Sequence, residues 1–200
     1  MFGNNLLKSL ATAAVLTVMA SGANAATVNF DTYHSGLNVG STTLGTLSAE
    51  QAGSDVQFVY TNTAFGYDPG HTTQLFLTYL GQQATVTLLN IAGVATDAFA
   101  KDASLTNAGL QFQFRVSWPT KNTGGGVLRL NPGESSTFKL LNTTLAGFFQ
   151  GDNSAMIHIQ GLTDGASAKY VSTSPVPVPA AGFLLVGALG GLAALRRRKV

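Results

Sequence analysis

The three histidines have the widest range of chemistry in this 200-residue chain, because it contains no cysteine. His34, His71 and His158 lie far apart in sequence and form no His-x-His or His-Glu-x-x-His spacing. A transition-metal site would therefore need all three to converge from separate loops. The pattern favours histidines that face solvent or have ordinary hydrogen-bond partners, and we expect neither a metal site nor another cofactor.

Three aspartates lie in turn sequences rich in glycine and asparagine. Asp68, Asp152 and Asp164 have the oxygen chemistry that calcium prefers, but their surroundings match no EF-hand or nonapeptide spacing. Aspartate is also a common turn former, which is the ordinary interpretation of these positions. A calcium-binding module stays open as an alternative.

Enzymatic signatures are weak. Glu50 and Glu134 are the only glutamates, and a glycosidase could use either of them with an aspartate. The segment 123–126, Thr-Gly-Gly-Gly, lacks the Lys-Ser/Thr and the helix of a phosphate-binding loop, and there is no Gly-x-Ser-x-Gly motif. We expect a protein that is not an enzyme, with an envelope enzyme acting on a glycan as the alternative.

Aromatic residues offer the best candidates for a ligand contact. Phe65 and Tyr67 stand beside an Asp-Pro-Gly turn, where an exposed pair of rings could stack on a sugar. Trp118 continues an alternating apolar pattern, and Phe148 and Phe149 suit a segment that caps a core. The sequence therefore predicts Phe65 and Tyr67 as ligand-facing and the other three as core residues.

Charge is distributed unevenly along the chain. The formal net charge is +2, but four of the eleven basic residues lie in 196–199. Between residues 26 and 175 there are six basic and nine acidic residues, which gives a net charge of −3. No basic stripe is left to neutralise phosphates, so we expect no nucleic-acid partner.

The N-terminal residues 1–25 have the organisation of a signal peptide. Lys8 supplies positive charge, and the apolar run 10–19 is about half of the length needed to cross a bilayer. Ala23 and Ala25 place small residues at the two positions that a signal peptidase reads. Cleavage is therefore predicted before Ala26, with signal peptidase as a partner.

Residues 26–171 alternate with period two, as half-buried strands do. Strands are expected around Val56 to Tyr60 and Leu110 to Trp118, and also at 27–33, 74–80, 84–90, 127–130, 136–141, 156–160 and 168–172. Glycine, proline and asparagine turns separate them. The pattern predicts one all-β domain, an antiparallel β-sandwich of jelly-roll or immunoglobulin-like type.

Two short helical turns are expected within this domain, at 95–101 and 145–150. Buried positions follow from the alternation. The predicted core residues are Phe58, Phe76, Leu88, Phe112, Phe114, Phe138 and Ile157.

The C-terminal segment contains four features in a fixed order. Residues 172–180 form a linker followed by a motif with alternating prolines, which keep the backbone extended. An apolar stretch, 181–195, is expected to form a single transmembrane helix. The basic tail 196–200 is expected to keep the C-terminal end of this helix in the cytoplasm. The motif consists of Val176, Pro177, Val178, Pro179 and Ala180, and the orienting residues are Arg196, Arg197, Arg198 and Lys199.

At these residues the chain resembles the bacterial PEP-CTERM sorting signals, in their Val-Pro-Leu-Pro-Ala variant, with Val178 in place of leucine. The resemblance implies an exosortase-like processing enzyme and transient residence in the inner membrane of a Gram-negative bacterium. It also implies a role at the cell surface or in the matrix, associated with exopolysaccharide and biofilm. The domain upstream resembles uncharacterised ectodomains that accompany such signals, which implies no activity.

Two classes of function follow. The first is a structural or adhesive surface protein that contacts polysaccharide or a neighbouring protein. The alternative is a glycan-active enzyme of the envelope or a calcium- or carbohydrate-binding module.

Overall fold

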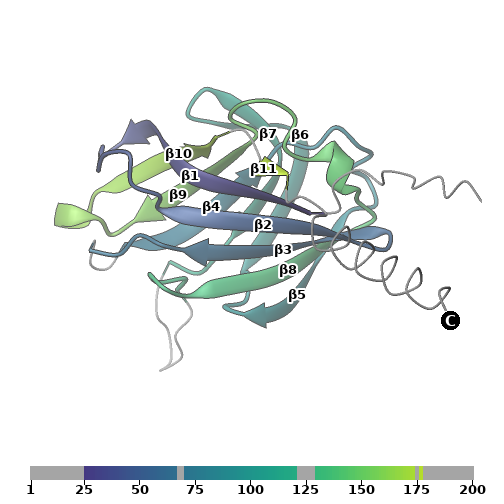
Figure 1. Ribbon diagram of the computed structural model, residues 1–200, viewed down its shortest axis with the longest axis horizontal. Helices are drawn as coiled ribbons and strands as arrows, with labels where there is room; N and C mark the ends of the chain where they lie inside the picture. The colour runs from purple at the N-terminus through teal and green to yellow at the C-terminus, as the bar shows by residue number, and fades with distance from the viewer. Residues whose placement is uncertain (1–24, 67–69, 121–128, 174–175, 178–200) are drawn as a thin grey trace, which may run out of the picture.

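A computed structural model describes residues 25–66, 70–120, 129–173 and 176–177 (Figure 1). These residues form an all-β, antiparallel fold, as the alternation predicted. The only helical segments in them are two single 3-10 turns, η1 (Leu145–Gly147) and η2 (Thr163–Gly165). The strands are β1 (Ala25–Gly36), β2 (Gly45–Ala52), β3 (Asp55–Asn62), β4 (His71–Leu77), β5 (Thr87–Gly93), β6 (Ala98–Asn107), β7 (Leu110–Ser117), β8 (Ser135–Leu141), β9 (Ala155–Gln160), β10 (Ser167–Ser172) and β11 (Val176–Pro177).

Ten strands follow one hydrogen-bonded path in the order β5-β8-β3-β2-β1-β10-β9-β4-β7-β6, and β11 pairs with β1. The two strands at the ends of this path, β5 and β6, are consecutive in the chain. The sheet therefore rolls back on itself and is nearly barrel-like (Figure 1). Each end strand has a neighbour on one side only, which leaves a seam between them.

Strand β1 joins the two halves of the path. Its residues 25–29 pair with β2, and its residues 30–36 pair with β10. The register with β10 shifts between Phe30 and Thr32 and again between Tyr33 and Ser35. Such bulges bend a strand and increase its twist, which allows one strand to take part in both halves.

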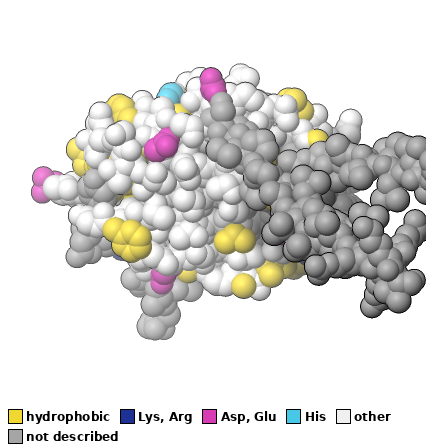
Figure 2. All heavy atoms as spheres, viewed as in Figure 1, with side chains coloured by type: hydrophobic (Ala, Val, Ile, Leu, Met, Phe, Trp, Pro, Cys, Tyr) yellow, Lys and Arg dark blue, Asp and Glu magenta, His cyan; other side chains and the backbone are white. Residues whose placement is uncertain are grey.

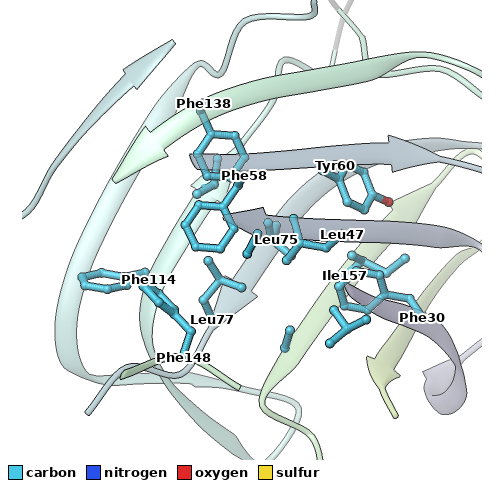
Figure 3. Packing of buried hydrophobic residues seen from close by; sticks show 14 of the residues in the cluster. Phe30, Leu47, Phe58, Tyr60, Leu75, Leu77, Phe114, Phe138, Phe148 and Ile157 are labelled. Carbon is cyan, nitrogen blue, oxygen red and sulfur yellow. The ribbon is translucent and has the colours of Figure 1, made fainter. Parts of the chain in front are cut away.

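The main core lies between the two halves and combines aromatic rings with leucine, isoleucine and valine side chains (Figure 3). Phe58 of β3 stacks on Phe138 of β8, with ring centroids 5.3 Å apart, and meets Phe148 edge-on at 5.1 Å. Trp118 is 1% exposed and lies against Tyr60. The prediction that Trp118, Phe148 and Phe149 are core residues is confirmed.

The other predicted core positions divide into three groups. Phe58, Phe114, Phe138 and Ile157 belong to the main core. Leu88 is half-buried at its margin. Phe76 and Phe112 are buried in a second cluster, together with Met156 and Val171.

This second cluster lies on the other face of β4, β9 and β10. Phe76 pairs with Met156, and Met156 pairs with Val171, while the residues beside them in sequence point into the main core. The β6–β7 hairpin covers the cluster, because Leu105 and Leu110 from near its tip pack against it. Nε2 of His34 lies 2.8 Å from the carbonyl oxygen of Ala108 at that tip, which ties the hairpin to β1.

Two sequence-based assignments need correction. Residues 95–101, expected as a helical turn, include the start of strand β6, because Ala98 to Lys101 pair with β7 and this pairing outweighs the local helix preference of alanine. Strand β2 was not predicted, since small and polar residues interrupt its apolar alternation. The turn expected at 145–150 is confirmed as η1, and residues 127 and 128 of the strand expected at 127–130 lie outside the described residues.

Candidate functional site

The residues between β3 and β4 lie beside the segment that precedes β8. A buried asparagine, Asn62, forms hydrogen bonds to both. Nδ2 of Asn62 donates hydrogen bonds to the carbonyl oxygens of Gly70 and Leu130, at 3.1 and 2.9 Å. Its Oδ1 accepts from the backbone N–H of Ala64 at 2.9 Å. Asn62 is fully buried, so these bonds form away from water and fix the two loops relative to each other.

Phe65 projects from this joined structure and is 65% exposed. Its ring lies over Gly133, where a Cβ atom would come within 3.3 Å of Cε1 of Phe65. The same turn is braced by Glu134, whose Oε2 accepts hydrogen bonds from the N–H and the Nδ2 of Asn131. Phe65 is thus an exposed ring on a supported loop, a suitable platform for stacking on a sugar ring or for an apolar contact with a protein.

Tyr67, the predicted partner of Phe65, lies outside the described residues, and so does Asp68. The prediction of Phe65 as ligand-facing is consistent with its exposure but stays a prediction, since the structure contains no ligand. The supporting role of Asn62 was missed by the sequence reasoning. The signal that could have indicated this role is the alternation itself, which places Asn62 on the same inward face of the strand as Phe58 and Tyr60, shortly before Phe65.

Two of the three histidines lie on neighbouring paired strands, His71 on β4 and His158 on β9. Oγ1 of Thr73 lies 3.1 Å from the carbonyl oxygen of His158 and 3.4 Å from its Nδ1. Burial is the largest cause that lowers the pKa of His158, the charges of Lys169 and His71 add to it, and together they bring it to about 4. His158 is therefore neutral at pH 7, whereas His34 lies apart at the β6–β7 hairpin.

The carboxylates are dispersed. Glu50 lies on β2 opposite Gln57, whereas the carbonyl oxygen of Glu134 accepts from Asn62 at the other end of β3. Asp152 and Asp164 lie in exposed turns. Among the residues that the structure describes, no three His, Cys, Asp or Glu side chains lie close enough together to hold a metal ion.

A pocket of about 400 Å³ lies along the seam between β5 and β6. Apolar side chains from Val86, Leu88 and Phe99 line it together with the polar residues Asn90 and Lys101. The alternating pattern did not predict this pocket, because the pocket depends on two strands that approach each other without forming a ladder.

The outer face of β1, β2, β3 and β8 is rich in hydroxyl groups. Oγ1 of Thr27 lies 3.1 Å from Oγ of Ser48, and Oγ1 of Thr61 lies 2.8 Å from Oγ of Ser135. Few charged side chains appear on this face (Figure 2). Contacts made here would depend on hydrogen bonding and shape rather than on charge.

The first and last described strands lie beside the predicted processing signals. Strand β1 begins at Ala25, the last residue of the predicted leader, and Ala26 and Thr27 pair with Pro177 and Val176 of β11. Ala23, Val178, Pro179, Ala180 and Arg196 to Lys199 lie outside the described residues. Within the part of the chain that the structure describes, no helix has the length and apolar character needed to cross a bilayer.

No family model matches the chain, and neither the curated proteins nor the solved structures contain a match to it.

Proposed function

We propose that this chain is an exported, non-enzymatic protein of the cell surface or extracellular matrix, sorted through the C-terminal motif that begins at Val176. Its leader is removed before Ala26 by signal peptidase. An exosortase-like enzyme then processes the chain near Ala180, while the segment 181–195 holds it in the inner membrane and the residues 196–199 fix the orientation. The β-domain, a flattened barrel or sandwich of jelly-roll or immunoglobulin-like type, is the product that reaches the surface.

One observation carries this proposal: the part of the domain that the structure describes lies between the two predicted processing points. Its first strand starts at Ala25, and its last paired residues are Val176 and Pro177, the first two of the sorting motif. Removal of the leader and of the segment beyond Ala180 would therefore leave every described strand in place, with at most Ala25 lost from the start of β1. A domain matched in this way to its processing points is expected of a protein that functions after both ends are removed.

The arrangement of the strands supports an adhesive role for the Phe65 loop. Ala26 lies level with Ala49 and, across β2, with Phe58 of β3. Asn62 lies four residues further along β3, or roughly 13 Å at about 3.3 Å per residue, and Phe65 follows beyond it. The loops around Phe65 thus lie at the opposite end of the described domain from the start of β1 and from β11 (Figure 1), where they would be free to contact polysaccharide or a neighbouring protein.

The proposal is tested by the intact mass of the protein recovered from the surface or matrix of the producing cells. We expect a chain that starts at Ala26 and ends close to Ala180. A surface protein that still contains Arg196 to Val200 would contradict sorting by cleavage and would indicate a membrane-anchored protein instead.

A further inference from the structure

Strand β11 is a continuation of β10 along the same neighbour. Strand β10 pairs with β1 up to the contact between Ser172 and Phe30, and the N–H of Thr173 then donates to the carbonyl oxygen of Asn29 at 3.3 Å. The next described residues, Val176 and Pro177, pair with Thr27 and Ala26. Strand β10 thus pairs with β1 as far as Phe30, and β11 pairs with the same edge of β1 closer to the N-terminal end of that strand.

This pairing gives Val176 and Pro177 a place in the sheet. Ala26 and Thr27 pair with β2 on one side, through Ala49 and Ser48, and with β11 on the other. Without β11, this second edge of β1 would expose unpaired backbone groups. The first residues of the predicted mature chain therefore form a docking edge for the first residues of the predicted sorting motif.

We infer that the folded domain and the processing enzyme compete for Val176 and Pro177. This inference rests on the proposed function, because it concerns the same motif. An enzyme that recognises an extended peptide binds its main chain and its alternate side chains. The main-chain groups of Val176 and Pro177 cannot pair with β1 and with the enzyme at the same time. Strand β11 must therefore leave the sheet before the enzyme can bind the whole motif, Val176 to Ala180. The strength of the β1–β11 pairing then sets the rate at which the folded protein is released from the membrane.

The first test weakens the docking edge without changing the motif. Thr27→Gly removes a strand-favouring residue opposite Val176, and Thr46→Gly, which makes the same change on β2 away from β11, is its matched control. Both full-length variants are expressed in the producing cells, and the loss of the C-terminal segment is followed by pulse-chase and mass analysis. We expect Thr27→Gly to be processed about two to five times faster than Thr46→Gly, the factor by which a glycine shifts a strand equilibrium.

The second test fixes β11 in place. The chain has no cysteine, so the double variant Thr27→Cys with Val176→Cys has a single way to form an intramolecular disulfide. The pair Thr61→Cys with Ser135→Cys, also directly opposite each other but on β3 and β8, is the control for a disulfide elsewhere. We expect the β1–β11 disulfide to slow processing at least fivefold until a reductant is added, and the control disulfide to leave the rate unchanged.

Three results would overturn the inference. They are equal processing rates for Thr27→Gly and Thr46→Gly, failure of the β1–β11 disulfide to form where the control disulfide forms, and equal rates for the oxidised and the reduced β1–β11 pair. These results differ from a failure of the proposed function, in which the wild-type chain itself would keep Arg196 to Val200 after export.

Discussion

Nζ of Lys101 on β6 donates a hydrogen bond to the carbonyl oxygen of Val86, 2.9 Å away, just before β5 begins. A second bond from the same ammonium reaches the carbonyl oxygen of Ala84. At the other end of the seam, the side chain of Asn90 bonds to the backbone and the hydroxyl of Thr96. Lys101 therefore connects β6 with the segment that leads into β5, and Asn90 connects β5 with the segment that leads into β6.

Replacement of Lys101 by methionine should open this seam. The variant keeps the aliphatic stem but loses both hydrogen bonds, so we expect the free energy of unfolding to fall by about 1 kcal/mol. Amide hydrogen exchange in Thr87–Gly93 should accelerate, while exchange in β9 should not. Lys169→Met on β10, away from β5 in the strand order, is the control for loss of a lysine charge. Equal exchange in β5 of the two variants would show that Lys101 does not hold the seam.

The hydrogen bond between Tyr60 and Thr72 should show strong coupling. The two hydroxyl oxygens lie 2.8 Å apart, both residues are fully buried, and the bond connects β3 with β4 across the core. Burial raises the pKa of Tyr60 well above its usual range, so the phenol stays protonated. Tyr60→Phe or Thr72→Val alone leaves one buried hydroxyl unpaired and should cost about 1–3 kcal/mol.

The double variant, Tyr60→Phe with Thr72→Val, should cost less than the sum of the two single changes, because no unpaired hydroxyl remains. Denaturant unfolding of the four proteins measures the coupling. Simple additivity would mean that the two hydroxyls do not depend on each other.

His158 should make stability depend on pH in the acid range. Its pKa is about 4 in the folded protein and about 6.5 in the unfolded chain. Between these values the unfolded chain takes up a proton that the folded protein does not, so the free energy of unfolding falls as the pH falls from about 6.5 towards about 4. The ring is partly open to solvent, so we expect a contribution on the order of 1 kcal/mol.

His158→Gln should flatten the pH dependence of denaturant unfolding over this window. Lys169→Met should flatten it in part, because it removes the second cause of the lowered pKa. A slope unchanged by His158→Gln would assign the acid sensitivity to other groups.

Phe65 should contribute to binding and little to folding. Because its side chain is 65% exposed, Phe65→Ala should change the free energy of unfolding by less than about 0.5 kcal/mol. Attachment of the purified domain to cells that lack the protein should weaken at least fivefold. Leu80→Ala is the matched control, since Leu80 is 76% exposed on a different loop, after β4. Equal attachment by both variants would exclude the Phe65 loop as the adhesive surface.

The all-β class of the fold could be predicted without the structure, because alternation in segments such as Val56 to Tyr60 places one face of each strand in the core whatever its neighbours are. It also predicted that Trp118 and Phe148 are buried and that Phe65 is exposed. These are local properties, which depend on residue type and on the nearest turn.

The partners of each strand, in contrast, depend on long-range contacts that only the folded chain reveals. Local preference placed a helical turn at 95–101, but pairing with β7 makes most of that segment part of a strand. The burial of Phe76 and Phe112 in a second cluster, the seam at Lys101 and the pairing of Thr27 with Val176 all join residues that are distant in sequence. Such contacts depend on strand order and on the bends in β1, which a pattern of period two does not encode, because every strand order preserves the same alternation.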